Sequence, residues 1–389
     1  MKIHIHVLLF LFVLLSFAGI ASVESHPRFA VREAVTCQRC HVDNQGAALR
    51  NEYGAGYYSR QVLPMDLWED FGGEEFTASI HEAIRWGTDI RMQYYSYSEE
   101  GSSRDAFFPM QGDLYLGITP LEKLTLYGEA SLFNLDAIRP DGRPAPAVRI
   151  WAQYELPNER GYVRVGQYNP AYGLRLDDHT SLIRGGNDGG GVINSAVANI
   201  PPDYQGLHWK PDRAARGLSL HFNTLGMEMT GYYGQPVSGS EGVAAVDLKS
   251  AFWAGEFNVL VGGSALNGSY TGNRRYTFAG LYGGVNYGRI TLLGEVDVHS
   301  DYTASGSMGY VTYSEMEISL VQGLSAVLEY EFYDADIEYS RNAFSRVSIG
   351  ADLFPIPYLE ILPQYRLVNV TNDSDFGRQE FILQGHLWF

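Results

Sequence analysis

The chain has 389 residues, with 27 tyrosines, 43 glycines, 13% aromatic residues and 19% charged residues, a composition typical of a β-rich protein. Its net charge of −17 argues against nucleic-acid binding, which requires a basic face. After residue 21, no stretch of about 18 apolar residues could form a membrane helix, so any membrane insertion must use strands.

Residues 1–21 have the features of a secretory signal peptide. Lys2 and two histidines precede an apolar run from Val7 to Ala21, which is too short to span a bilayer. The small residues Gly19 and Ala21 favour cleavage after Ala21. An uncleaved anchor is the alternative, but no second span follows. We therefore expect the mature chain outside the cytoplasm.

The sequence Cys37-Gln38-Arg39-Cys40-His41 contains both cysteines of the chain. Its spacing is that of c-type haem attachment, in which each thiol forms a thioether with one haem vinyl group and the histidine ligates the iron. We predict one covalent haem c held by Cys37 and Cys40, with His41 as proximal iron ligand. A small disulfide is the main alternative. A zinc site lacks a second ligand pair, and a redox dithiol lacks a thioredoxin-like context.

Residues 22–81 are interpreted as a short, partly helical haem segment, located in the periplasm or in the interior of a barrel. Leu49, Tyr53 and Tyr57 have helical spacing and predict a helix within 46–60. Such a short unit buries little core, so we expect its fold to depend on the haem or on the barrel.

The second, distal iron ligand is not evident from the motif. Met65 supplies the best-placed thioether and His26 a nearby imidazole, so these two residues are the distal candidates. His81 is the other imidazole close to the motif. The remaining histidines are interpreted as lumen, loop or interface residues: His179, His208, His221, His299 and His386.

From Glu82 onward, apolar and polar residues alternate with a period of two. In the expected strand 289–299, for example, Ile290 and Leu292 would point to one face, and Glu295 and Asp297 would point to the other. A soluble sandwich would turn the polar face to water, whereas a membrane barrel would turn it to the lumen. Short links alternate with longer polar stretches along the chain, and this pattern favours the barrel.

We therefore predict an all-β fold, a transmembrane antiparallel β-barrel of about 16 strands formed by residues 82–389. The expected strands are 82–98, 109–118, 122–135, 146–157, 160–168, 216–223, 226–234, 243–253, 256–270, 275–287, 289–299, 306–320, 323–338, 343–354, 357–370 and 378–389. This count treats 169–215 as one long external loop. The loop includes the glycine-rich run 185–191, which we interpret as flexible turn material.

The last strand carries a further signal. Phe381, Leu383, Gly385, Leu387 and the terminal Phe389 alternate on one face. This pattern resembles the C-terminal strand that outer-membrane barrels present to their assembly machinery. An even strand count also leaves both termini on the periplasmic side.

The order Pro27-x-Phe29-Ala30-x-Arg32, haem motif and predicted porin barrel resembles the fused monohaem cytochrome-porins of iron-oxidising bacteria. The motif match covers residues 26–41, and beyond it the resemblance is one of architecture. It implies electron transfer across the outer membrane of a Gram-negative bacterium, between an external donor or acceptor such as ferrous iron and periplasmic c-type cytochromes or other carriers. The functional residues that this resemblance implies are Cys37, Cys40 and His41.

Two other functions stay open. The protein could be a porin or transporter with a haem-containing periplasmic plug, or a structural or sensing subunit of a larger multihaem conduit. One-electron cycling of a haem requires no proton-transferring side chain, so no catalytic residue is nominated, and an Fe(II) oxidase activity is left open. Lumen arginines are expected to pair with the haem propionates: Arg85, Arg91, Arg149 and Arg366. The expected surroundings are outer-membrane lipid.

Overall fold

The computed structural model describes residues 27–43, 46, 48–66, 78–99, 102–134, 148–168, 170–174, 176, 181–184, 215–224, 227–236, 241–269, 275–302, 305–339, 343–370 and 373–389. The predicted signal peptide, His26 and the glycine-rich run 185–191 lie outside these residues. None of the helices in the described ranges has the length and apolar character of a membrane span.

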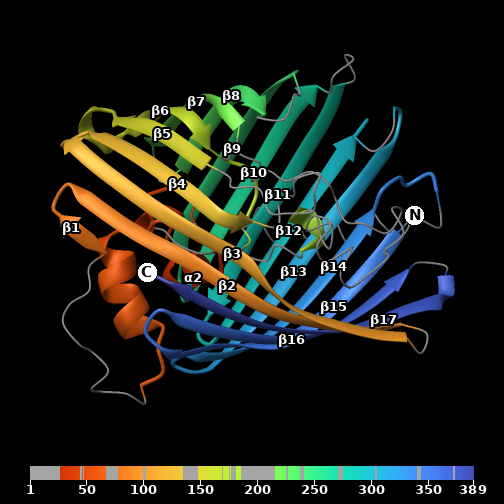
Figure 1. The fold of residues 1–389 in the computed structure, drawn as a ribbon. Coiled ribbons are helices and arrows are strands. Elements are labelled where there is room, and N and C mark those ends of the chain that lie inside the picture. The colour runs from red at the N-terminus through yellow and green to blue at the C-terminus, as the bar shows by residue number, and fades with distance from the viewer. Residues whose placement is uncertain are drawn as a thin grey trace.

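The described strands close into one antiparallel barrel (Figure 1). In these residues sixteen strands form its wall: β2 (Ile84–Glu99), β3 (Ser102–Leu121), β4 (Leu124–Asn134), β5 (Val148–Glu155), β6 (Gly161–Tyr168), β7 (Ala215–Thr224), β8 (Met227–Pro236), β9 (Glu241–Ala254), β10 (Phe257–Ser269), β11 (Arg275–Tyr287), β12 (Ile290–Ser300), β13 (Met308–Val321), β14 (Leu324–Asp334), β15 (Ala343–Ile356), β16 (Leu359–Val370) and β17 (Asp373–Trp388). Each strand pairs with the next, and β17 pairs with β2 to close the barrel. The short β1 (Ser79–His81) pairs with the start of β2. The predicted fold class is therefore confirmed.

The two-residue period decides which side chains face the lumen. In β12, Glu295, Asp297 and His299 are buried, whereas Ile290 and Leu292 are exposed on the outer surface. A buried charge is costly unless it is paired or hydrogen-bonded, so a wall of this kind needs partners inside the barrel. Two stretches of the chain provide them.

The two ends of the barrel differ in the length of their connections. At one end, here called the short-turn end, two-residue turns such as 288–289 and 322–323 join neighbouring strands. Gly288 and Gly323 have φ values of 56° and 76° there, which glycine adopts without steric cost. Phe389 pairs with Thr88 at the same end. The two longest stretches between strands, 135–147 and 169–214, follow strands that end at the opposite, long-loop end.

The described residues of 27–66, here called the plug, form three short elements: α2 (Pro27–Glu33), η1 (Cys37–Arg39) and η2 (Tyr53–Val62). The helix predicted within 46–60 begins later than expected. The Val42 amide donates to Leu49 and the Asn51 amide donates to Cys40, each over 2.9 Å, so this stretch folds back on the motif instead. Helix α2 packs against β10, β11 and β12 (Figure 1).

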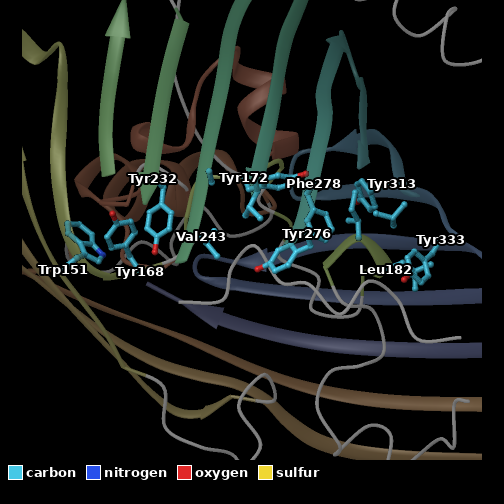
Figure 2. Packing of buried hydrophobic residues seen from close by; sticks show 14 of the residues in the cluster. Trp151, Tyr168, Tyr172, Leu182, Tyr232, Val243, Tyr276, Phe278, Tyr313 and Tyr333 are labelled. Carbon is cyan, nitrogen blue, oxygen red and sulfur yellow. The ribbon is translucent and has the colours of Figure 1, made fainter. Parts of the chain in front are cut away.

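The described residues of 170–184, here called the inner segment, lie in the lumen. The prediction of one wholly external loop over 169–215 is therefore wrong for these residues. The amide of Leu174 donates to Glu295 over 2.9 Å, and the amide of Leu182 donates to Glu331 over 2.7 Å. Figure 2 shows Tyr172 and Leu182 among aromatic side chains of the wall. Backbone donors of the inner segment thus provide hydrogen bonds to buried carboxylates of the wall.

Candidate functional site

The plug is seated at the short-turn end of the barrel. The Met65 amide donates to the carbonyl of Phe354 over 2.8 Å, and the Tyr358 hydroxyl donates to the carbonyl of Ala55 over 3.1 Å. The side chain of Gln322, in the turn between β13 and β14, donates to the carbonyls of Gln61 and Pro64 over 3.0 and 2.9 Å. The end of the plug is therefore bound to the rim by main-chain and turn contacts.

Buried ion pairs join the plug to one side of the wall. The Nη1 atom of Arg28 lies 3.1 Å from Oδ2 of Asp352, and its Nε lies 3.7 Å from Oε1 of Glu315. Arg32, one helical turn further, pairs with Glu317. All three carboxylates are almost fully buried, so the two guanidinium groups compensate charges that water does not reach.

The opposite side of the wall holds the plug as well. Thr36 donates to Glu228 on β8 over 2.6 Å, and Arg164 on β6 lies 2.9 Å from Asp43. Arg50 pairs with Asp89 on β2 over 3.2 Å. Together with the contacts to β13 and β15, these bonds fasten the plug around the circumference of the lumen.

The haem motif forms a tight turn within the plug. The amides of Cys40 and His41 both donate to the carbonyl of Cys37, over 3.3 and 3.1 Å. Asn51 caps the turn, because its side chain donates to the carbonyls of Gln38 and Arg39. Gly54 packs so closely beneath the turn that a Cβ there would overlap the Cys40 carbonyl oxygen. The turn is therefore fixed by its own bonds and by the start of η2.

Cys37, Cys40 and His41 line one cavity between the plug and the barrel wall, with an empty volume of about 1210 Å³ that includes space open to solvent. Apolar side chains pack around Cys40 on this side: Phe29, Tyr58, Leu63, Phe354 and Trp388. Burial raises the pKa of the Tyr58 phenol well above its usual value, with Glu33 adding to the effect, so this phenol stays neutral.

Charged side chains line the cavity as well. Arg28, Arg50, Arg91 and Arg366 contribute to the lining, together with Glu315, Glu329 and Glu360. A porphyrin with two carboxylates needs an apolar surface for its ring and cationic donors for its edge, and guanidinium groups bind carboxylates strongly. The residues present therefore fit a covalently attached haem.

Two of the four arginines expected near the propionates lie elsewhere. Arg85 pairs with Glu52 at the rim over 3.2 Å, and Arg149 pairs with Glu129. Neither residue lines the cavity, whereas Arg91 and Arg366 do. The strand pattern places all four on the lumen side, but only their height along the barrel decides which of them reach the cavity.

No protein-family model and no curated protein matches the sequence. Solved structures of outer-membrane channels match the fold. The anion-selective porin from Comamonas acidovorans aligns with a TM-score of 0.54 and 11% identity, over 79% of this chain and 99% of that one. The outer membrane channel DcaP of Acinetobacter baumannii gives 0.55 and 10%, over 79% and 97%. Salmonella typhi OmpF in complex with daunomycin gives 0.53 and 13%, over 79% and 97%.

The chain has a porin fold. Each of these matches leaves about a fifth of this chain uncovered while covering almost all of the porin, so this chain carries an addition to the porin architecture. The comparisons do not test the haem, which stays a prediction from the sequence motif and the cavity.

Of the residues considered as the distal ligand, Met65 and His81 do not line the cavity. The side chain of Met65 lies against Gly323 in the turn between β13 and β14, and Met65 is not among the cavity residues. His81 is exposed at the rim, where its Nδ1 accepts the amide of Ala83 over 3.2 Å. His26 lies outside the described residues.

His386 is the cavity residue that sequence reasoning did not single out. It lies on the lumen side of β17 and contributes to the cavity lining. Its position in the strand predicts that it faces the lumen, but the sequence gives no sign of how close it comes to the haem motif, more than 300 residues earlier. Pairing of β17 with β2 brings the two together.

Proposed function

We propose that the protein is an outer-membrane electron-transfer barrel of a Gram-negative bacterium, with one covalent c-type haem in its plug. It passes single electrons between a donor or acceptor on the long-loop side and a carrier in the periplasm. The observation that carries this proposal is the shared cavity, where the three residues of the haem motif meet apolar side chains and arginines.

The outer surface of the barrel supports a place in a lipid bilayer. Large apolar side chains are exposed on the outward positions of successive strands, as with Leu218 and Leu220 on β7, Met229 on β8 and Leu292 on β12. A soluble protein rarely exposes so continuous an apolar surface. Transmembrane strands need about 9–11 residues, and β12 has 11. Outer-membrane lipid is thus the proposed surrounding.

The plug residues have defined roles in this proposal. Cys37 and Cys40 would form the thioethers, His41 would ligate the iron, and Arg91 and Arg366 would bind the haem carboxylates. The bound haem supplies one-electron cycling of its iron, which needs no acid, base or nucleophile from the protein. The apolar cluster around Cys40 excludes water from the ring.

The way the plug is held favours a fixed redox unit over a movable gate. It is bonded to β2, β6, β8, β13 and β15, and four of these contacts are ion pairs with a buried wall residue. Removing one partner of a buried pair typically costs about 3–5 kcal/mol, so releasing the whole plug would be very costly. A carrier reaches the plug from the short-turn end, which we assign to the periplasm because outer-membrane barrels have their short turns on that side. The resemblance to cytochrome-porins implies ferrous iron as the external donor.

Haem attachment is tested first, on full-length protein in outer-membrane fractions. Haem staining after denaturing electrophoresis should show a band for the wild type and none for the double variant Cys37→Ala, Cys40→Ala. His221→Ala, at a buried lumen residue that does not line the cavity, is the control and should keep the stain. A stain that persists in the double variant would refute covalent haem.

Electron transfer is tested on the purified protein in liposomes that enclose a redox dye. A membrane-impermeant donor outside should reduce the dye through the wild type and not through the double cysteine variant. Equal reduction with both proteins, or none with haem-loaded wild type in the correct orientation, would overturn the electron-transfer function.

A solute channel is the second candidate, and the porin fold favours it. A channel should give steady ion conductance in planar bilayers with the plug in place. If the wild type conducts ions at the level of an open porin while no electrons cross, the haem segment is a plug of a channel and the electron-transfer proposal gives way to it.

A further inference from the structure

Resting on the haem site proposed above, we infer that His386 of the barrel wall is the second axial ligand of the haem iron. The plug would then supply the covalent attachment and the proximal imidazole, and the wall would supply the distal imidazole. The iron would link two parts of the chain that lie more than 300 residues apart in the sequence.

The first argument is position. His386 and His41 are both buried and both line the same cavity. Among the described residues that line it, they are the two imidazoles. Haem iron is commonly held by histidine, and an imidazole that already faces the cofactor space needs no movement of the chain to reach it.

The second argument is proximity through a short series of contacts. His41 pairs with Arg50 as opposite residues of a β-bridge. The guanidinium of Arg50 lies 3.2 Å from Asp89, and Asp89 lies 2.9 Å from Nε2 of His386. Arg50 also lies 5.3 Å from the ring centre of Trp388, whose ring is 4.9 Å from that of His386. Trp388 in turn belongs to the apolar cluster around Cys40. His386 therefore stands beside the surface on which an attached haem would lie.

The third argument is the setting of the imidazole. Its Nδ1 lies 2.9 Å from a carboxylate oxygen of Glu360. Histidines that ligate metals usually donate their other ring N–H to a carboxylate or carbonyl, which fixes the ring and strengthens the ligand. Glu360 is placed for this role, leaving Nε2 as the ligating atom.

Releasing Nε2 from Asp89 does not strand that carboxylate. Asp89 also accepts a hydrogen bond from the Tyr115 hydroxyl over 2.8 Å and pairs with Arg50. Ligation by His386 thus exchanges one hydrogen bond for a bond to iron, while the buried carboxylate keeps two partners. A buried carboxylate without partners would instead oppose the change.

The other groups of suitable chemistry are less well placed. Met65 lies against Gly323, outside the cavity lining. Tyr58 lines the cavity, but its phenol is held neutral by burial, and a tyrosine binds iron as the phenolate. Tyr313 donates its hydroxyl proton to Glu315 over 2.5 Å. His386 is therefore the best-placed distal ligand in the described part of the chain.

The test uses the full-length, haem-loaded protein in detergent. The ferric wild type should be low-spin by electron paramagnetic resonance, and near-infrared magnetic circular dichroism should give the band of two imidazole ligands. A wild-type band for imidazole and thioether ligands would overturn the inference, and this measurement depends on no variant.

The decisive variant is His386→Gln, because glutamine can still bond Glu360 and Asp89 but does not ligate haem iron as an imidazole does. It should keep the covalent haem stain and the heat-modifiable migration of a folded barrel, lose the low-spin signal for a high-spin one, and regain low spin when free imidazole is added. His221→Gln, at another buried lumen histidine, should leave the spectrum unchanged.

The outcomes separate the inference from the proposed function. A His386→Gln protein with the stain and an unchanged low-spin spectrum would overturn His386 as ligand and leave the haem proposal intact. Conversion to high spin by Met65→Leu would do the same. A wild type without covalent haem would overturn the proposed function and this inference with it.

Discussion

The plug and the inner segment both fill the lumen, but they bind the same kind of wall in different ways. The plug brings its own charges, and Arg28, Arg32 and Arg50 pair with buried carboxylates. The inner segment brings neutral donors, such as the amides of Leu174 and Leu182. The wall carboxylates accept both kinds of partner, so one acidic lumen can hold one segment rigidly by charge and another by weaker bonds.

The two segments also differ in what they enclose. The plug and the wall leave a cavity lined by the haem motif, whereas the inner segment packs directly into aromatic side chains such as Tyr168, Tyr276 and Phe278 (Figure 2). Val31 of α2 and Leu174 of the inner segment meet in one small apolar cluster with wall residues. The two segments therefore meet through apolar side chains, while the charged plug residues named above pair with the wall.

The largest effect is expected from removing a charge of the plug. Arg28→Met leaves Asp352 and Glu315 without their guanidinium partner, and should lower the free energy of local opening of the plug by about 3–5 kcal/mol. Hydrogen exchange of the Val35 amide, which donates to Ala30, measures that opening. Arg39→Met is the control, because Arg39 is exposed and lies over the Tyr53 ring, and it should change opening by less than about 1 kcal/mol. Equal effects of the two variants would show that charge pairing does not hold the plug.

A smaller effect is expected from crowding the haem motif. Gly54→Ala places a methyl group against the Cys40 carbonyl and should destabilise the plug by about 1–3 kcal/mol, with a lower yield of covalent haem. Gly56→Ala is the matched control in the same helix, since no atom lies within 4 Å of a Cβ there. It should be neutral or stabilise by up to about 1 kcal/mol. Haem content per protein and exchange of the plug amides are the measurements, and equal haem content in the two variants would contradict the close packing.

The smallest effect is expected in the inner segment. Ser181 donates its hydroxyl to Glu331 over 2.7 Å, and Glu331 keeps the Leu182 amide and Arg346 as partners when that bond is lost. Ser181→Ala should therefore lower the free energy of local opening at the Leu182 amide by about 1.5 kcal/mol, which is measured as faster hydrogen exchange there. Hydrogen exchange of the plug amides should stay unchanged. Ser98→Ala, at an exposed position of β2, is the control. Faster exchange in the plug as well would mean that the two segments open together.

Much of the barrel could be predicted from the sequence because strand patterning is local. The two-residue period follows from the backbone, so a strand expected at 275–287 is found at Arg275–Tyr287, and sixteen strands are found in the described residues. Some irregular parts could not be predicted. The helix expected within 46–60 starts at Tyr53 because residues 48–51 form main-chain hydrogen bonds with the haem motif. No local sequence pattern predicts these hydrogen bonds.

The sequence by itself determined the strands, the side of each strand that is polar, and the motif Cys37, Cys40 and His41, because these depend on neighbours a few residues apart. The tertiary structure alone decided that the described residues of 170–184 turn inward, that Arg91 and Arg366 reach the cavity while Arg85 and Arg149 do not, and that His386 lines the same cavity as the motif. These facts depend on strand register and on closure of β17 against β2, which bring together residues hundreds of positions apart. Such contacts depend on how buried charges pack with their partners in three dimensions, and they cannot be predicted from the spacing of residues along the chain.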